Sequence, residues 1–90
     1  MNTTTLTTAL IRLSKQRLGV KEAATLFLIA EPMSSSKIAA ALGIDKGHVL
    51  ARIQVLRGKK LARNTWTPDG TVLYTLTPEG KKLVNQVLQP

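Results

Sequence analysis

The sequence predicts a small domain that is mainly α-helical and carries one β-hairpin. Apolar residues recur at helical spacing through the first two thirds of the chain, and a Pro-Asp-Gly turn separates two Thr- and Val-rich segments near its end. Hydrophobic residues make up 43% of the chain but aromatic residues only 3%, so the core must consist of Leu, Ile, Val and Ala. Such a core suits packed helices better than a sandwich of strands, and 90 residues allow a single domain spanning 1–90.

The first two helices are predicted from apolar spacing and from the residues that interrupt it. Leu6, Leu10 and Leu13 predict an N-terminal helix within residues 1–18, which Gly19 breaks. A second helix is expected over residues 20–30. It ends before Pro32, because proline cannot continue a helix and favours an extended conformation in the residue before it.

A short third helix begins at three consecutive serines, residues 34 to 36. Serine is a common N-cap, because its hydroxyl oxygen accepts a hydrogen bond from a backbone amide that the first helical turn leaves unpaired. The helix ends at Gly43, where the chain requires a left-handed residue and glycine adopts that conformation without a steric penalty.

A fourth helix follows directly. Asp45 is its expected cap, and Val49, Ile53 and Leu56 recur on one side of it at i, i+4 and i+7. Residues 34–57 are therefore predicted to form two short helices joined by a tight glycine turn, which is a helix-turn-helix. This motif holds its second helix at an angle that fits a DNA major groove.

A β-hairpin is predicted over residues 61–76. Its two halves are rich in Thr, Val, Trp and Tyr, which favour strands, and Pro68-Asp69-Gly70 supplies the turn between them. Trp66 is expected to lie half-buried against its own sheet, with a DNA sugar or a partner as the alternative contact. Thr77 and Pro78 are typical of a helix start, so a last helix is expected over residues 78–88.

The positive charge is concentrated in one part of the sequence. The net charge is +8, and residues 46–63 hold six of the 13 Lys and Arg and none of the five Asp and Glu. Such a cluster predicts binding to a polyanion, most often nucleic acid. The alternative is that the cations at the end of the fourth helix only balance its dipole.

Several classes of protein are excluded by composition. The chain has no cysteine and one histidine, so we expect no disulfide, no metal site and no cofactor. Its longest uncharged apolar run is far shorter than a membrane span and its start lacks a secretory signal, so we expect a cytoplasmic protein without membrane contact. We expect no enzyme either, because helix capping accounts for the serines and Asp45 near His48.

The stretch IAAALGIDKGHVLARIQVLRGKKLAR, residues 38–63, resembles the DNA-binding segment of winged-helix regulators of the MarR type. The matching positions are Ile38, Ala39, Leu42, Gly43, Ile44, Lys46, Val49, Ile53, Leu56 and Leu61. Residues 63–88 are similar to that family's wing and closing helix, including a Leu-Thr-x-x-Gly passage that begins at Leu76. The resemblance implies a winged helix-turn-helix fold with about five helices and a two-stranded wing. Because the chain stops at Pro90, before the long C-terminal helix usual in that family, it implies a small, truncated member.

The resemblance implies a transcriptional regulator that binds double-stranded DNA with the helix over residues 46–57 in the major groove. Gln54 suits an adenine edge and Ala51 a thymine methyl group, whereas the serines and the cations suit phosphates. The residues expected to contact DNA are Ser34, Ser35, Ser36, Lys37, Lys46, Gly47, His48, Ala51, Arg52, Gln54, Lys59, Lys60 and Arg63.

The terminal helices are the expected site of a homodimer, since that family usually pairs through them. The apolar residues concerned are Leu6, Leu10, Leu13, Leu83, Val87 and Leu88, which could instead close the core of one chain. In one respect the sequence departs from the family pattern: the residue before the strand-opening Leu61 is usually glycine there and is Lys60 here, with Gly58 two residues earlier.

Two other functions remain open from the sequence. The outward side of the fourth helix is small and weakly polar, with Gly47, Leu50, Ala51 and Val55, so it could receive a helix of another protein. A DNA-binding accessory factor in phage or plasmid replication or maintenance would carry the same residues as a regulator.

Overall fold

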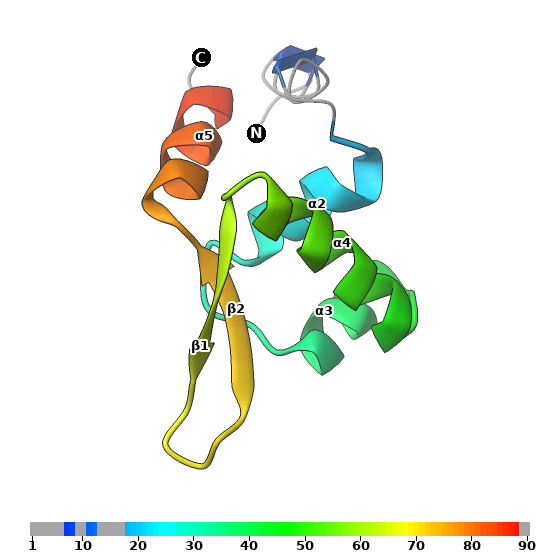
Figure 1. Cartoon of the computed structure of the whole chain (residues 1–90). Coiled ribbons are helices and arrows are strands. Elements are labelled where there is room, and N and C mark those ends of the chain that lie inside the picture. The colour runs from blue at the N-terminus through cyan, green and yellow to red at the C-terminus, as the bar shows by residue number, and fades with distance from the viewer. Residues whose placement is uncertain (1–6, 9–10, 13–17, 89–90) are drawn as a thin grey trace.

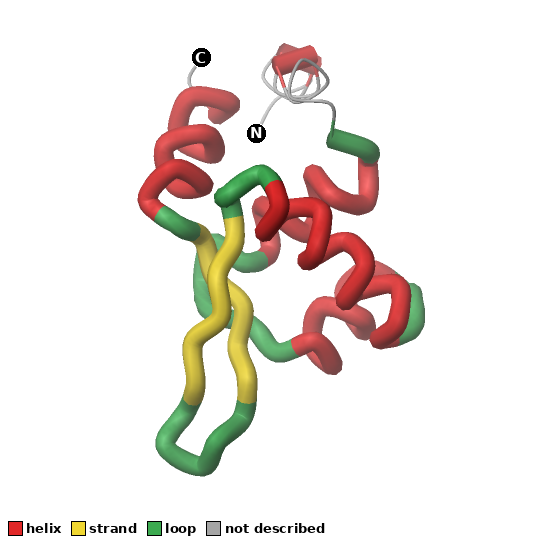
Figure 2. The backbone as a smooth tube through the Cα atoms, in the orientation of Figure 1, coloured by secondary structure: helices red, strands yellow, loops and turns green. Residues whose placement is uncertain are grey.

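The computed structural model describes residues 7–8, 11–12 and 18–88. It is mainly helical with one two-stranded antiparallel hairpin, as predicted (Figures 1 and 2). The elements with described bounds are α2 (Val20–Leu28), α3 (Ser35–Leu42), α4 (Lys46–Gly58), β1 (Ala62–Trp66), β2 (Val72–Leu76) and α5 (Pro78–Leu88). The described part thus contains four bounded helices, and most of the N-terminal helix expected within residues 1–18 lies outside the described residues.

The core lies between α2, α3, α4, α5 and the hairpin. Its fully buried aliphatic side chains are Leu26, Ile29, Ile38, Val49, Ile53, Leu56, Leu76 and Val87. The apolar side predicted for the fourth helix is confirmed, because Val49, Ile53 and Leu56 all point inward. Each such burial contributes about 1.5–3 kcal/mol, so aliphatic packing accounts for the cohesion of a domain with few aromatic residues.

The turn between α3 and α4 has the predicted chemistry. Gly43 is left-handed, with φ 67° and ψ 33°, and the amide of Ile44 donates to the carbonyl of Ala39 at 3.2 Å. Asp45 caps α4 through its Oδ1, which accepts a hydrogen bond from the amide of His48 at 2.9 Å. The glycine ends one helix and the carboxylate begins the next, so the direction of α4 is set by local contacts.

The hairpin is shorter than predicted and is attached to the helices along one edge. The strands pair from Ala62 opposite Leu76 to Trp66 opposite Val72. Thr67 and Thr71, which were expected in the strands, belong to the turn. On the free edge of β2, Met33 and Tyr74 exchange two backbone hydrogen bonds of 3.0 and 2.8 Å. The segment before α3 therefore acts as a short third strand, which ties the hairpin to the helix-turn-helix.

The last helix begins as predicted, at Pro78. The hydroxyl of Thr77 accepts a hydrogen bond from the amide of Gly80 at 3.0 Å and donates to the carbonyl of Lys60 at 2.6 Å. The N-terminal segment reaches this helix through Arg12, whose guanidinium donates to the carbonyl of Gln86. Within the part of the chain that the structure describes, no helix is long and apolar enough to cross a membrane.

The second helix is shorter than expected, ending at Leu28 rather than at residue 30. The amide of Ala30 bonds to Phe27 in a tighter turn, and Ile29 is buried while Ala30 is exposed. The carbonyl of Ile29 accepts a hydrogen bond from the hydroxyl of Thr75 at 3.3 Å. The chain therefore leaves the helix where the carbonyl of Ile29 bonds to β2 of the hairpin.

Candidate nucleic-acid interface

The outward side of α4 is uncovered in the described structure. Gly47, His48 and Gln54 are exposed, and Ala51 is half-buried. Leu50, beside them, is 43% exposed although it is a large apolar residue. The outward side therefore consists of small, apolar and amide-bearing residues, with charged side chains only along its margins.

The start of α3 contributes hydroxyl groups and one cation. The Ser34 hydroxyl accepts a hydrogen bond from the Lys37 amide at 3.3 Å, so it is the N-cap of α3. Ser35 is half-buried, and Ser36 and the Lys37 side chain are exposed. The Ser34 hydroxyl is therefore already used in the cap. Ser36 and Lys37 are the residues of this group that are best placed to contact a ligand.

His48 and Asp45 lie together at the start of α4. The His48 Nδ1 is 3.6 Å from the Asp45 Oδ2, and both side chains are about two-thirds exposed or more, at 67% and 71%. This pair is ionic only when the histidine is protonated, and exposed pairs of this kind contribute little to stability. The amide of His48 is already used by the cap.

Arg52 is placed differently from the sequence-based expectation. Its Nη1 lies 3.4 Å from Glu22 Oε2 on α2, and the two side chains are only 32% and 16% exposed. The Arg52 Nε is buried and has no hydrogen-bond partner among the described residues. Arg52 therefore leans against α2 and is not a free cation at the margin of α4, and sequence spacing gave no sign that Glu22 would be its partner.

The basic cluster of the sequence is divided in space. Lys46 stands at the first turn of α4, and Lys59 and Lys60 follow its last residue. A helix of 13 residues is about 18–20 Å long, so these cations lie at opposite ends of it. Arg63 is exposed in β1, beyond the second group. The sequence cluster is therefore divided between one cation, Lys46, at the start of α4 and a group of cations at and beyond its end.

The end of α4 is shaped by Lys60. The amide of Lys60 donates to Arg57 at 2.9 Å and that of Leu61 to Leu56 at 2.9 Å, which is the Schellman pattern of helix ends. Lys60 holds the left-handed position of this motif with φ 62°, whereas Gly58 is the last residue of the helix. A side-chain-bearing residue therefore occupies the position that usually takes glycine.

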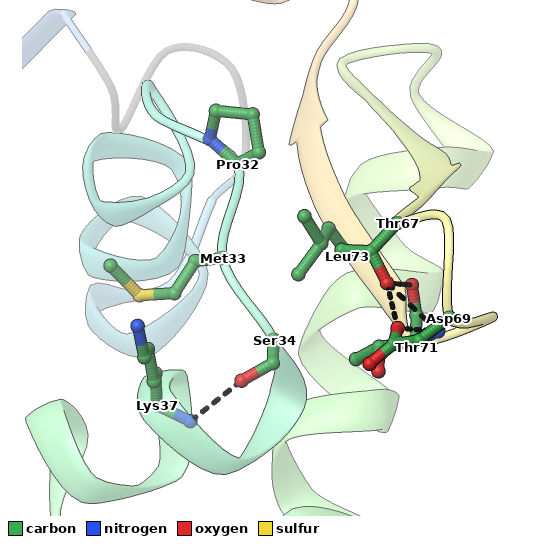
Figure 3. Close-up of a pocket in the computed structure, with 8 residues that line it drawn as sticks. All are labelled: Pro32, Met33, Ser34, Lys37, Thr67, Asp69, Thr71 and Leu73. Carbon is green, nitrogen blue, oxygen red and sulfur yellow. Dashed lines mark hydrogen bonds between the residues drawn. The ribbon is translucent and has the colours of Figure 1, made fainter.

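A groove of about 360 Å³ lies between the hairpin and the start of α3 (Figure 3). It is lined by Pro32, Met33, Ser34, Lys37, Thr67, Asp69, Thr71 and Leu73. Hydrogen bonds from the Thr67 hydroxyl, and then from the Thr71 amide, hold the pKa of the Asp69 carboxyl below its usual value. The groove is therefore lined by the Asp69 carboxylate on the hairpin side and by Lys37 on the α3 side.

Two further observations complete the site. Trp66 is 62% exposed, so the expectation that it is half-buried against its sheet is wrong. Its place at the end of β1, next to the turn, is the signal that could have indicated this. Among the described residues, no group of three His, Asp or Glu side chains is placed to hold a metal ion.

Comparison with known proteins identifies the fold. No protein-family model matches this sequence, and no curated protein sequence matches it. Among solved structures, the chain is similar to the transcriptional regulator Tm0710 of Thermotoga maritima, with a TM-score of 0.86 and 16% identity over 94% of this chain and 63% of that one. It is also similar to a MarR-family regulator of Rhodococcus sp. RHA1, with a TM-score of 0.76 and 24% identity over 93% of this chain and 63% of that one.

A third solved structure was determined with nucleic acid. This is the F27L mutant of Staphylococcus aureus MepR bound to an oligodeoxyribonucleotide, with a TM-score of 0.79 and 21% identity over 92% of this chain and 64% of that one. The chain covers just under two thirds of the length of the MepR structure, at 64%, and about half of the length of another similar structure, at 49%. The described elements and these similarities together show that the chain has the winged helix-turn-helix fold of MarR-type regulators.

Proposed function

We propose that this protein binds double-stranded DNA through α4 and acts in the cytoplasm as a transcriptional regulator. The observation that carries the proposal is the uncovered outward side of a capped second helix in a helix-turn-helix. Support comes from the net charge of +8 and from a fold shared with the MepR mutant whose structure was solved bound to an oligodeoxyribonucleotide. The fold alone would not assign the function, so the residues at the surface of α4 are the part to test.

The roles of the residues follow from their positions. In the major groove, Gln54 would pair with an adenine edge, and Ala51 would contact a thymine methyl group, while Gly47 lets the backbone approach closely. Phosphate contacts would come from the remaining exposed members of the expected set, which are Ser36, Lys37, Lys46, His48, Lys59, Lys60 and Arg63. Lys46 and Lys59 would then bind backbone segments on opposite sides of the groove, since α4 separates them.

A homodimer is part of the proposal, with the terminal helices as its interface. Val87 is only 1% exposed within one chain, so it closes the core of the monomer and is not available to a partner. The dimer interface would therefore use the N-terminal segment and the side of α5 that faces away from the core. On a palindromic site the half-sites would lie about 34–36 Å apart, which a footprint on native DNA and sedimentation equilibrium can test together.

The primary test is binding to a labelled duplex as a function of salt. The logarithm of the association constant should fall linearly with the logarithm of salt concentration, with a slope of about −0.9 for each phosphate neutralised. Lys46→Ala should make that slope less steep by about 0.9, the value of one phosphate contact. Glu79→Gln on α5 serves as a control at another exposed position. Absence of binding at low salt, or a slope near zero, would contradict the proposal.

A second function is supported by one observation, the 43% exposure of Leu50 on a helix side without central charges. Such a surface could dock a helix of another protein through Gly47, Leu50, Ala51 and Val55. Replacing Lys37 and Lys46 together by alanine distinguishes the two functions, because phosphate binding weakens while apolar docking does not. A role in phage or plasmid replication or maintenance also involves DNA binding. The location of the footprint on native DNA distinguishes this role from transcriptional regulation.

A further inference from the structure

We propose that DNA binding by this protein takes up a proton at His48, so that the complex is tighter in mild acid. This inference rests on the proposed function and adds a regulatory property to the same site. His48 is the single histidine of the chain and is exposed in the first turn of α4. Histidine is the side chain whose charge ordinarily changes between about pH 5 and 8. A proton here therefore alters the charge of the proposed binding surface close to neutral pH.

Asp45 places a negative charge at the end of α4 that would enter the groove. Its carboxylate caps the helix by accepting a hydrogen bond from the His48 amide at 2.9 Å, and its side chain is 71% exposed. Phosphates line the edges of a DNA groove, so an exposed carboxylate at this end repels the ligand. The carboxylate cannot turn away without leaving the helix uncapped. Binding is therefore stronger if this charge is offset where it lies.

The imidazole of His48 is the group placed to offset that charge. Its Nδ1 lies 3.6 Å from the Asp45 Oδ2, and the two form an ion pair only when the histidine is protonated. Lys46 is adjacent in sequence but forms no ion pair with Asp45 in the described structure. Arg52, one turn further along α4, is bound to Glu22 instead. The offset of the Asp45 charge therefore depends on the proton.

The elements around α4 supply no other partner for this pair. α4 packs against α2, α3 and β1 (Figure 1). The charged residues within these three elements are Lys21, Glu22, Lys37 and Arg63. In the part of the chain that the structure describes, none of them forms an ion pair with His48 or Asp45. The charge at the start of α4 is therefore set by the two residues together.

The proton is held more tightly in the complex than in the free protein. In the free protein, the positive end of the α4 dipole disfavours a cation at His48, and an exposed pair with Asp45 counteracts this only weakly. Phosphates close to the same turn add negative charge that favours the imidazolium. Affinity is therefore greatest below the titration range of the histidine and is lost as the pH rises through it.

The test is binding of the protein to a labelled duplex, at constant salt, between about pH 5.5 and 8.5. Affinity should fall roughly fivefold to tenfold across this range. Calorimetric titrations in two buffers with different ionisation enthalpies should show the uptake of up to about one proton on binding. His48→Gln keeps the backbone amide that the cap uses. This variant should bind at every pH with the affinity that the wild type has at about pH 8.5.

Two further variants separate the local charge from the total charge. Asp45→Asn keeps a capping side chain but removes the carboxylate, so it should bind more tightly than the wild type at about pH 8.5 and depend less on pH. Glu79→Gln removes the same charge from an exposed position in the first turn of α5. It should bind within about twofold of the wild type and keep the pH dependence. Circular dichroism at both ends of the pH range establishes that each variant is folded.

The outcomes separate this inference from the proposed function. If the wild type binds DNA with a steep salt slope but with equal affinity at every pH, the inference is overturned and the proposed function stands. The same holds if the pH dependence survives in His48→Gln, because another group then takes up the proton. Equal affinity of Asp45→Asn and the wild type at high pH also overturns it, since Asp45 is then not the charge that the proton offsets. If the wild type does not bind duplex DNA at any pH, both fail.

Discussion

The guanidinium of Arg52 on α4 lies 3.4 Å from the carboxylate of Glu22 on α2, and this contact joins residues 30 positions apart. Both side chains are largely shielded from water, so the pair is stronger than an exposed one. The Glu22 carboxylate also lies close to the backbone of Gly19, where a Cβ would come within 2.9 Å of Oε2. Glu22 therefore positions Arg52 and helps to set the orientation of α4 against α2.

Glu22→Gln should lower the free energy of unfolding by about 1–3 kcal/mol, because the half-buried Arg52 loses its charged partner. Urea denaturation of Glu22→Gln, Arg52→Gln and the double variant gives the coupling energy of the pair. A coupling near zero would mean that the contact does not stabilise the domain. The released Arg52 should also steepen the salt slope of DNA binding by about 0.9 in Glu22→Gln.

Lys60→Gly should stabilise the domain. Lys60 is left-handed with φ 62°, a conformation that costs a side-chain-bearing residue roughly 1 kcal/mol relative to glycine. The matched variant Gly58→Ala should also stabilise by up to about 1 kcal/mol, since Gly58 is helical and a Cβ there meets no atom within 4 Å. Thermal unfolding of both variants tests this. A loss of stability in Lys60→Gly would show that the lysine side chain makes contacts that outweigh the strain.

Gly80→Ala should destabilise the domain by about 1–3 kcal/mol. A Cβ at this position would lie 2.2 Å from the carbonyl oxygen of Leu61, and backbone atoms cannot move aside as a flexible side chain can. The same region holds the hydrogen bond from the Thr77 hydroxyl to the Lys60 carbonyl, which joins the start of α5 to the end of α4. Chemical denaturation measures the loss, with Gly58→Ala as the control for an alanine in a helix. Unchanged stability would mean that α5 can shift away from the hairpin.

The hairpin turn should loosen in acid. Its Asp69 has a lowered pKa because the ionised carboxylate accepts hydrogen bonds from the Thr67 hydroxyl and the Thr71 amide. A lowered pKa means that the stabilisation is fully present above the ordinary value of 3.8 and is lost as pH falls through the lower value of the folded state. The amide proton shift of Thr71, followed by NMR through this range, reports the transition. Asp69→Asn should abolish it, and a transition that persists in this variant would assign it to another group.

The sequence by itself determined the parts of the structure that depend on neighbouring residues. The cap at Asp45, the left-handed Gly43, the inward side formed by Val49, Ile53 and Leu56, and the Pro-Asp-Gly hairpin turn all appear where the sequence predicts them. Each involves atoms within a few positions along the chain, so the local chemistry is enough to specify it.

Only the tertiary structure decided which of the candidate binding residues are free. It paired Arg52 with Glu22, exposed Trp66, and required a left-handed lysine at position 60. These outcomes depend on how α2, α4 and the hairpin lie against one another. Charge spacing along the chain carries no information about such contacts, because a partner 30 residues away is selected by packing and not by proximity in sequence.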